Sequence, residues 1–125
     1  MIVLDASVLI AHLDAHDAHH AAATRRLLDL AEQPFGAGTV TLAEVLVGPT
    51  RSGRLAEAEA ALGALDVAEL QLPADSARKL AALRAETALK LPDCCVLLAA
   101  ASVDGRVLTL DERLSREAAR RGLAA

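Results

Sequence analysis

Short apolar runs along the chain alternate with longer segments of helical composition. The runs typical of strands are IVL at residues 2–4, VAELQL at 67–72 and RVLTL at 106–110, and the turn-rich QPFGAG encloses a further short strand near Phe35. Helices are predicted over residues 6–13, 18–32, 41–48, 53–65, 75–89, 92–102 and 111–122. Strands separated by helices predict an α/β fold with a parallel sheet covered on both faces.

Local signals set the ends of two predicted helices. The sequence Thr41-Leu42-Ala43-Glu44 matches a capping box, so a helix should begin near Thr41, with Glu44 reaching back to the backbone. Gly48 and Pro49 should then end that helix. Pro92 favours the first turn of another helix, and Asp93 follows it, where a negative charge stabilises the helix dipole.

Acidic residues stand at element boundaries, and two of them follow strands directly. Asp5 comes immediately after residues 2–4, and Asp111 immediately after 106–110. Both should therefore project from the edge of the sheet where ligands of parallel α/β proteins bind. Asp5, Asp111, Glu44 and Asp93 could each also stabilise the start of a helix. This capping interpretation accounts for each acid separately.

Taken together, the four acids favour a metal site. Carboxylates gathered at one edge repel one another unless a cation lies between them. Oxygen ligands suit Mg²⁺ or Mn²⁺, and zinc is disfavoured because no His adjoins these positions and the two cysteines lack zinc-type spacing. No Lys, His or Ser adjoins the acids in a nucleophile–base pattern, so a water nucleophile in phosphodiester hydrolysis is favoured over a covalent intermediate.

Composition narrows the remaining possibilities. At 125 residues the chain is expected to form one domain, 1–125, and its net charge of −4 argues against coating of nucleic acid. His12 and His16 have zinc-pair spacing, but a solvated helix connection is favoured. Cys94 and Cys95 are neighbours, which disfavours a disulfide. We expect a cytoplasmic protein, with no signal peptide, no membrane span and no phosphate-binding P-loop.

Three stretches resemble the PIN-domain ribonucleases, specifically the VapC-type toxins of type II toxin–antitoxin systems. They are IVLDASVLIAHLD, TLAEVLVGP and LPDCCVLLAAASVDGRVLTLDERL, in the family's order and roughly its spacing. The resemblance implies a three-layer sandwich with a parallel sheet flanked by helices, a metal-dependent ribonuclease using Mg²⁺ or Mn²⁺, and a homodimer bound by a VapB-like antitoxin. It implies an acidic quartet supported by two hydroxyls: Asp5, Glu44, Asp93, Asp111, Ser7 and Thr109.

The chain departs from the family pattern at two places. Leu110 stands where many members have Asn, and the sequence ends in RRGLAA, where members often continue into a final short strand. Two other functions remain open from the residues alone. A phosphatase of the haloacid dehalogenase type also places Asp after its first strand, although it needs a second Asp where Ser7 stands. The other alternative is a PIN-like module that binds RNA or protein without cleaving.

Overall fold

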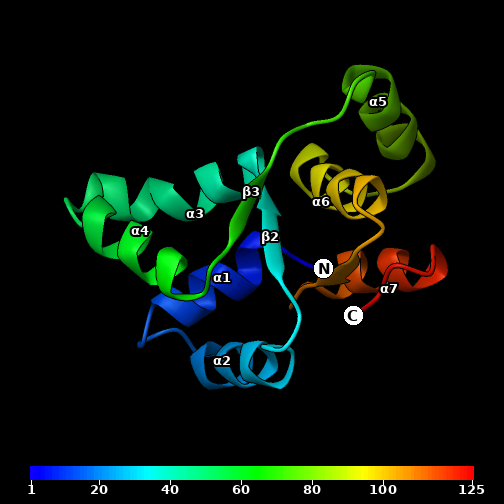
Figure 1. Cartoon of the computed structure of the whole chain (residues 1–125). Coiled ribbons are helices and arrows are strands. Elements are labelled where there is room, and N and C mark those ends of the chain that lie inside the picture. The colour runs from blue at the N-terminus through cyan, green and yellow to red at the C-terminus, as the bar shows by residue number, and fades with distance from the viewer.

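The fold of the chain was obtained as a computed structural model that describes all 125 residues. Four short strands alternate with seven helices (Figure 1). In chain order these are β1 (Ile2–Leu4), α1 (Ala6–Leu13), α2 (His20–Asp29), β2 (Phe35–Gly38), α3 (Thr39–Arg51), α4 (Leu55–Ala64), β3 (Ala68–Leu70), α5 (Ser76–Glu86), α6 (Leu91–Ser102), β4 (Arg106–Leu108) and α7 (Glu112–Arg120). Every predicted element is present, most of them shorter than the sequence pattern indicated.

The strands form one parallel sheet in the order β3-β2-β1-β4. Strand β1 is central, and Ile2 pairs with Phe35 on one side and Arg106 on the other. Gly105 permits the close approach of β4, because a Cβ there would lie 2.9 Å from the Met1 carbonyl oxygen. Placing β1 beside β4 brings the residues that follow these two strands to the same edge of the sheet.

Alternating side chains of β1 pack in two hydrophobic cores, one on each face of the sheet. Ile2 and Leu4 pack in a cluster with α1, α2 and Phe35, whereas Val3 packs with residues of α6 and α7. Because successive strand residues point to opposite faces, a continuous apolar strand requires helices on both sides. The predicted three-layer sandwich is therefore confirmed.

Helix α6 is the most buried helix, with every residue from Cys94 to Ala100 buried. It packs on three strands and between α3 and α5, which explains why it is apolar on all sides. Cys94 and Cys95 are both free thiols. Neither α6 nor any other helix has the length and apolar character needed to cross a membrane.

Helix α3 corrects both predicted ends of the 41–48 segment. It begins two residues earlier, at Thr39 after the N-cap Gly38, and no side chain caps it. The capping-box prediction was wrong because the buried strand β2 runs directly into the helix, which leaves Thr41 within its first turn. The helix also continues through Pro49 to Arg51. Pro49 costs little there because it removes only one hydrogen bond, close to the end of the helix.

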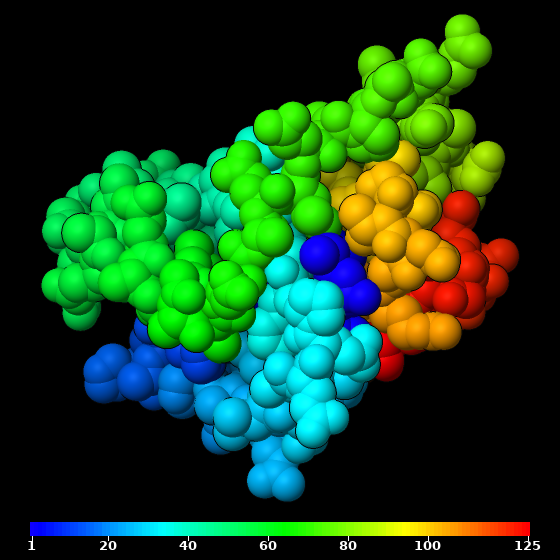
Figure 2. All heavy atoms as spheres, viewed as in Figure 1, coloured from blue at the N-terminus to red at the C-terminus, as the bar shows by residue number.

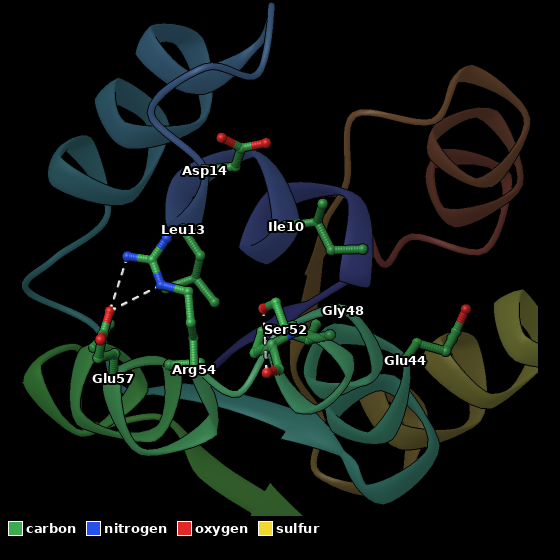
Figure 3. A pocket seen from close by; sticks show the side chains of 12 residues that line it. Ile10, Leu13, Asp14, Glu44, Gly48, Ser52, Arg54 and Glu57 are labelled. Atoms are coloured by element: carbon green, nitrogen blue, oxygen red, sulfur yellow. Dashed lines mark hydrogen bonds and ion pairs between the residues drawn. The ribbon is translucent and has the colours of Figure 1, made fainter.

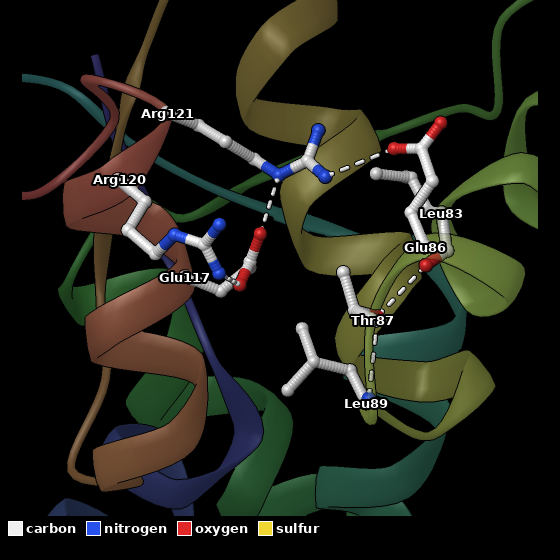
Figure 4. A network of polar contacts seen from close by, with 7 residues as sticks. All are labelled: Leu83, Glu86, Thr87, Leu89, Glu117, Arg120 and Arg121. Atoms are coloured by element: carbon white, nitrogen blue, oxygen red, sulfur yellow. Dashed lines mark hydrogen bonds and ion pairs between the residues drawn. The ribbon is translucent and has the colours of Figure 1, made fainter.

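Helix α5 stands out from the body of the molecule, and Figure 2 shows it projecting in yellow-green. None of its residues is buried. An ion-pair network fastens its end to α7, because Arg121 contacts Glu86 of α5 at 3.2 Å and Glu117 of α7 at 3.1 Å (Figure 4). Thr87 turns the chain after α5, donating to the Leu83 carbonyl and accepting from the Leu89 N–H.

The chain end forms a single bridge rather than a full fifth strand. Ala124 pairs in parallel with Val107 of β4. Val107 donates its N–H to the Leu123 carbonyl at 2.6 Å and accepts from the Ala125 N–H at 3.0 Å. The sequence RRGLAA is thus sufficient to place a strand-like segment along the outer side of β4.

Candidate functional site

Asp5 is fixed by two hydroxyl groups from opposite ends of the sequence. Its Oδ2 accepts hydrogen bonds from Ser7 Oγ and Thr109 Oγ1, both at 2.7 Å. The two hydroxyls in turn accept the backbone N–H groups of Leu110 and Asp111, each at 3.0 Å. Since each hydroxyl has one proton and gives it to Asp5, the carboxylate has a single defined orientation.

The other oxygen of Asp5 has no hydrogen-bond partner. The residue is only 7% exposed, yet no buried side-chain oxygen or nitrogen of the protein lacks a partner, so Oδ1 must reach solvent. Asp5 is also the N-cap residue of α1, but its side chain makes no capping hydrogen bond. The capping interpretation therefore fails for Asp5, whose second carboxylate oxygen is free to bind a ligand.

Glu44 in α3 and Asp93 in α6 are both near enough to Asp5 for its charge to act on them. Partial burial, followed by the negative charges of Asp5 and Asp93, raises the pKa of Glu44. Partial burial, with the charges of Asp5 and Asp111, likewise raises the pKa of Asp93, and the neighbouring Lys90 offsets part of this effect. The structure therefore brings together Asp5, Glu44 and Asp93 as mutually repelling acids, a pattern that marks functional sites.

Asp111 lies at the rim of this acidic group and has a structural role. It is exposed and is the N-cap of α7, where its Oδ1 accepts the Leu114 N–H at 2.9 Å. The capping interpretation is thus confirmed for Asp111, which keeps one carboxylate oxygen free. Its charge still acts on Asp93. Of the four acids, Asp111 is the one whose position is best explained without a metal, because its carboxylate caps α7.

The donor chemistry fits Mg²⁺ or Mn²⁺, although the acids are not closed around an ion. Carboxylate oxygens are the hard ligands these cations prefer. No group of three or more His, Cys, Asp or Glu side chains is gathered closely enough to hold a metal. Glu44 is exposed and Asp93 only partly buried, so both side chains have room to turn toward Asp5.

A groove of about 570 Å³ lies between α1, α3 and α4, and Glu44 stands at its edge (Figure 3). Its apolar wall includes Ile10, Leu13 and Val45. At the other end from Glu44, Arg54 is paired with Glu57 at 2.9 Å. The groove therefore joins an apolar surface to the acidic group.

Two residues of the histidine-rich segment, His12 and His20, pack and form hydrogen bonds between α1 and α2. His12 and His20 stack with ring centroids 6.2 Å apart, between α1 and α2. His12 Nδ1 lies 2.8 Å from Thr24 Oγ1, and His20 Nδ1 lies 2.9 Å from the Ala11 carbonyl oxygen, to which it must donate. Burial, with the neighbouring His20, lowers the pKa of His12. The expectation of a solvated connection was correct for the exposed His16, but His12 is partly buried.

Comparison with protein families decides the identity of the fold. The model of the family described as "PIN domain" matches residues 2–119. The chain belongs to the PIN-domain family. The matched residues include all four candidate acids, Asp5, Glu44, Asp93 and Asp111. Membership in this family excludes the alternative of a phosphatase of the haloacid dehalogenase type. No curated protein matches the chain in sequence.

Three solved structures similar to this PIN domain are a toxin and two toxin–antitoxin complexes. A toxin–antitoxin complex from Klebsiella pneumoniae matches with a TM-score of 0.74 and 23% identity, covering 92% of this chain and 91% of the other. VapC20 of Mycobacterium tuberculosis, a toxin that cleaves the sarcin–ricin loop, matches with a TM-score of 0.75 and 19% identity, covering 94% and 95%. VapBC2 of Rickettsia felis, bound to promoter DNA, matches with a TM-score of 0.71 and 17% identity, covering 93% and 92%.

Two basic residues border the acids without having been singled out from the sequence. Lys90 precedes α6 and acts on Asp93 through its charge. Arg116 lies on α7 in the wall of a small pocket beside Thr109 and Asp111. The signal for Lys90 was its place three residues before Asp93 at the start of a helix. Arg116 had none, because SREAARRG reads as an ordinary solvated helix face.

Proposed function

We propose that this PIN domain is a metal-dependent ribonuclease that hydrolyses RNA phosphodiester bonds in the cytoplasm as the toxin of a toxin–antitoxin pair. One observation carries the proposal most directly. The charge of Asp5, which follows β1, raises the pKa of both Glu44 in α3 and Asp93 in α6 in addition to the effect of their partial burial, and the Asp5 carboxylate itself is oriented by two hydroxyls. The structural similarity to toxins, one of which cleaves RNA, supports the same function.

Each acid has a place in the proposed site. Asp5 and Asp93 are the proposed direct metal ligands, because Asp5 has a carboxylate oxygen without a hydrogen bond and Asp93, in the first turn of α6, is near enough for the charge of Asp5 to act on it. Glu44 and Asp111 bind a second ion or act through water. When Mg²⁺ or Mn²⁺ is bound, it supplies positive charge that polarises the scissile phosphate and acidifies a water molecule.

Ser7 and Thr109 are positioning residues. Ser7 Oγ is occupied on both sides, since it donates to Asp5 and accepts from the Leu110 N–H. A serine held in this way is poorly placed to attack phosphorus, so the nucleophile is water. The two hydroxyls instead keep Asp5 in one orientation, while Glu44, which is not assigned as a direct ligand, is the carboxylate that can accept a proton from that water.

A VapB-like antitoxin is the proposed partner, with the groove between α1, α3 and α4 as its site. An apolar wall that includes Ile10, Leu13 and Val45 suits the apolar face of a helix. Glu44 at the edge of the groove would place such a helix directly beside the acids. Assembly as a homodimer belongs to the same proposal and rests on the family resemblance.

Cleavage of RNA with and without metal tests the ribonuclease proposal. The purified protein is incubated with total bacterial RNA and, separately, with DNA, in EDTA, Mg²⁺ or Mn²⁺. We expect discrete RNA fragments only with metal, and loss of these fragments in Asp93→Asn. Asp104→Asn is the matched control, because Asp104 is exposed at the other end of α6 and makes no side-chain hydrogen bond.

The outcomes separate the alternatives. Full cleavage by a folded Asp93→Asn variant would exclude the proposed mechanism, and circular dichroism establishes that the variant is folded. RNA binding without cleavage in either metal would instead indicate a non-catalytic binding module. An equal loss of RNA cleavage in Asp104→Asn would show that the effect of removing a negative charge is not specific to the acidic site.

A further inference from the structure

The acidic site presents an electrostatic difficulty for an RNA substrate. The chain has a net charge of −4, and carboxylates gather where a polyanion would have to enter. Phosphate contacts provide most of the affinity of proteins for nucleic acid, and Lys and Arg supply them. The question is which of the basic side chains are both free and close to the acids.

Several basic side chains are already engaged within the protein. Five of the thirteen Lys and Arg side chains make an ion pair or a hydrogen bond within the chain: Arg25, Arg54, Arg106, Arg120 and Arg121. The other eight have no such partner. Among these eight, Lys90 and Arg116 border the acids, whereas Arg26, for example, lies on α2, which leads into the start of β2 at the other end of the sheet (Figure 1).

Lys90 stands on the α6 side of the acids. It is the N-cap residue of α6, is exposed, and makes no ion pair, although its charge acts on the neighbouring Asp93. A cation that is near an acid but not bound to it remains available for another anion. Its flexible side chain suits contact with a phosphate as a point charge.

Arg116 stands on the α7 side. With the Ser115 hydroxyl it lines a pocket of about 260 Å³, which also includes Thr109, the hydroxyl that positions Asp5. Arg116 is exposed and has no partner, and its guanidinium suits bidentate contact with phosphate. Asp111 and Glu112 line the same pocket, so Arg116 is the only cation in its wall.

We propose that Lys90 and Arg116 bind RNA phosphates on the two sides of the acidic site, and so hold the strand across the sheet edge between the starts of α6 and α7. This rests on the proposed ribonuclease function and adds to it the residues that bind the substrate backbone. Both are positioning residues. Neither touches Asp5, so removing them should weaken RNA binding and leave the acids in place.

RNA binding without cleavage tests the proposal directly. A fluorescein-labelled single-stranded RNA is titrated with the full chain in EDTA at several salt concentrations. We expect Lys90→Ala and Arg116→Ala each to weaken binding about fivefold, and to lower the slope of log K against log salt by about 0.7 per removed contact. Lys90→Arg and Arg116→Lys should restore most of the slope. Arg26→Ala, which removes the same charge at the far end of the sheet, should leave it unchanged.

Cleavage kinetics distinguish a failure of this proposal from a failure of the ribonuclease function. With metal, the Lys90→Ala/Arg116→Ala double variant should show KM raised more than tenfold, with kcat within about twofold of wild type. Cleavage by wild type, together with an unchanged slope and KM in the double variant, would overturn the assignment of these two cations alone. If wild type binds RNA with the expected slopes but no metal supports cleavage, the ribonuclease function fails and the two cations stand as RNA contacts. Absence of RNA binding by wild type would overturn both.

Discussion

Replacing Thr109 by Val should destabilise the protein and impair the proposed site. The substitution keeps the side-chain shape and removes one hydroxyl, which donates to the buried Asp5 and accepts from the Asp111 N–H. A hydrogen bond to a charged group contributes roughly 1.5–3 kcal/mol, and some of that is recovered by water because Asp5 Oδ1 and Asp111 reach solvent. We therefore expect a loss of about 2 kcal/mol in the free energy of unfolding.

Urea denaturation measures this loss. With an m-value near ~1.5 kcal/mol/M, the midpoint should fall by about 1 M with the m-value unchanged. Thr39→Val is the matched control, because Thr39 also donates to a carboxylate, that of Glu69 at 2.9 Å, but both residues are exposed. The control should change the free energy of unfolding by less than about 0.5 kcal/mol. Equal effects of the two substitutions would refute the argument that the orientation of Asp5 depends on a buried, charged hydrogen bond.

Two further predictions concern the acids and the sheet. Asp93→Asn and Glu44→Gln should each stabilise the metal-free protein above neutral pH. Because the pKa of each acid is raised in the folded protein, the wild type loses stability as pH rises through the folded-state pKa. Unfolding is measured between about pH 4 and about pH 8, and the unfolding free energies of wild type and variant should converge at the acidic end. Gly105→Ala should lower the unfolding free energy by about 1–3 kcal/mol, since its Cβ would press on the Met1 carbonyl. Gly63→Ala, with nothing within 4 Å, should not destabilise, and thermal unfolding compares the two.

Much of the fold was predictable because the relevant signals are local. The run IVL is apolar at every position, so it had to be a strand covered on both faces, and the acids that follow β1 and β4 had to share an edge. The ends of α3 were not predictable in the same way. The capping box at Thr41 is a local signal, but the start of the helix is set by the buried strand before it.

The site itself depends on contacts that no local pattern reports. Thr109 and Ser7 lie 102 residues apart and meet at one oxygen of Asp5. Only family resemblance pointed to them before the structure showed the contact. The capping interpretation was correct for Asp111 and wrong for Asp5, although both follow a strand and precede a helix. The difference is that the Asp5 carboxylate accepts from two hydroxyls, Ser7 in the first turn of α1 and Thr109 directly after β4.

The pairing of Ala124 with Val107 bears on how the protein should be produced for these experiments. Residues 123–125 occupy the N–H and carbonyl of Val107 that would otherwise face outward from β4. A chain shortened by these three residues would present open backbone groups to other molecules, and exposed strand edges are templates for aggregation. Affinity tags are therefore better joined through a flexible linker after Ala125 than in place of the last residues, and poor solubility of a shortened variant would reflect this uncovered edge rather than damage to the acidic site.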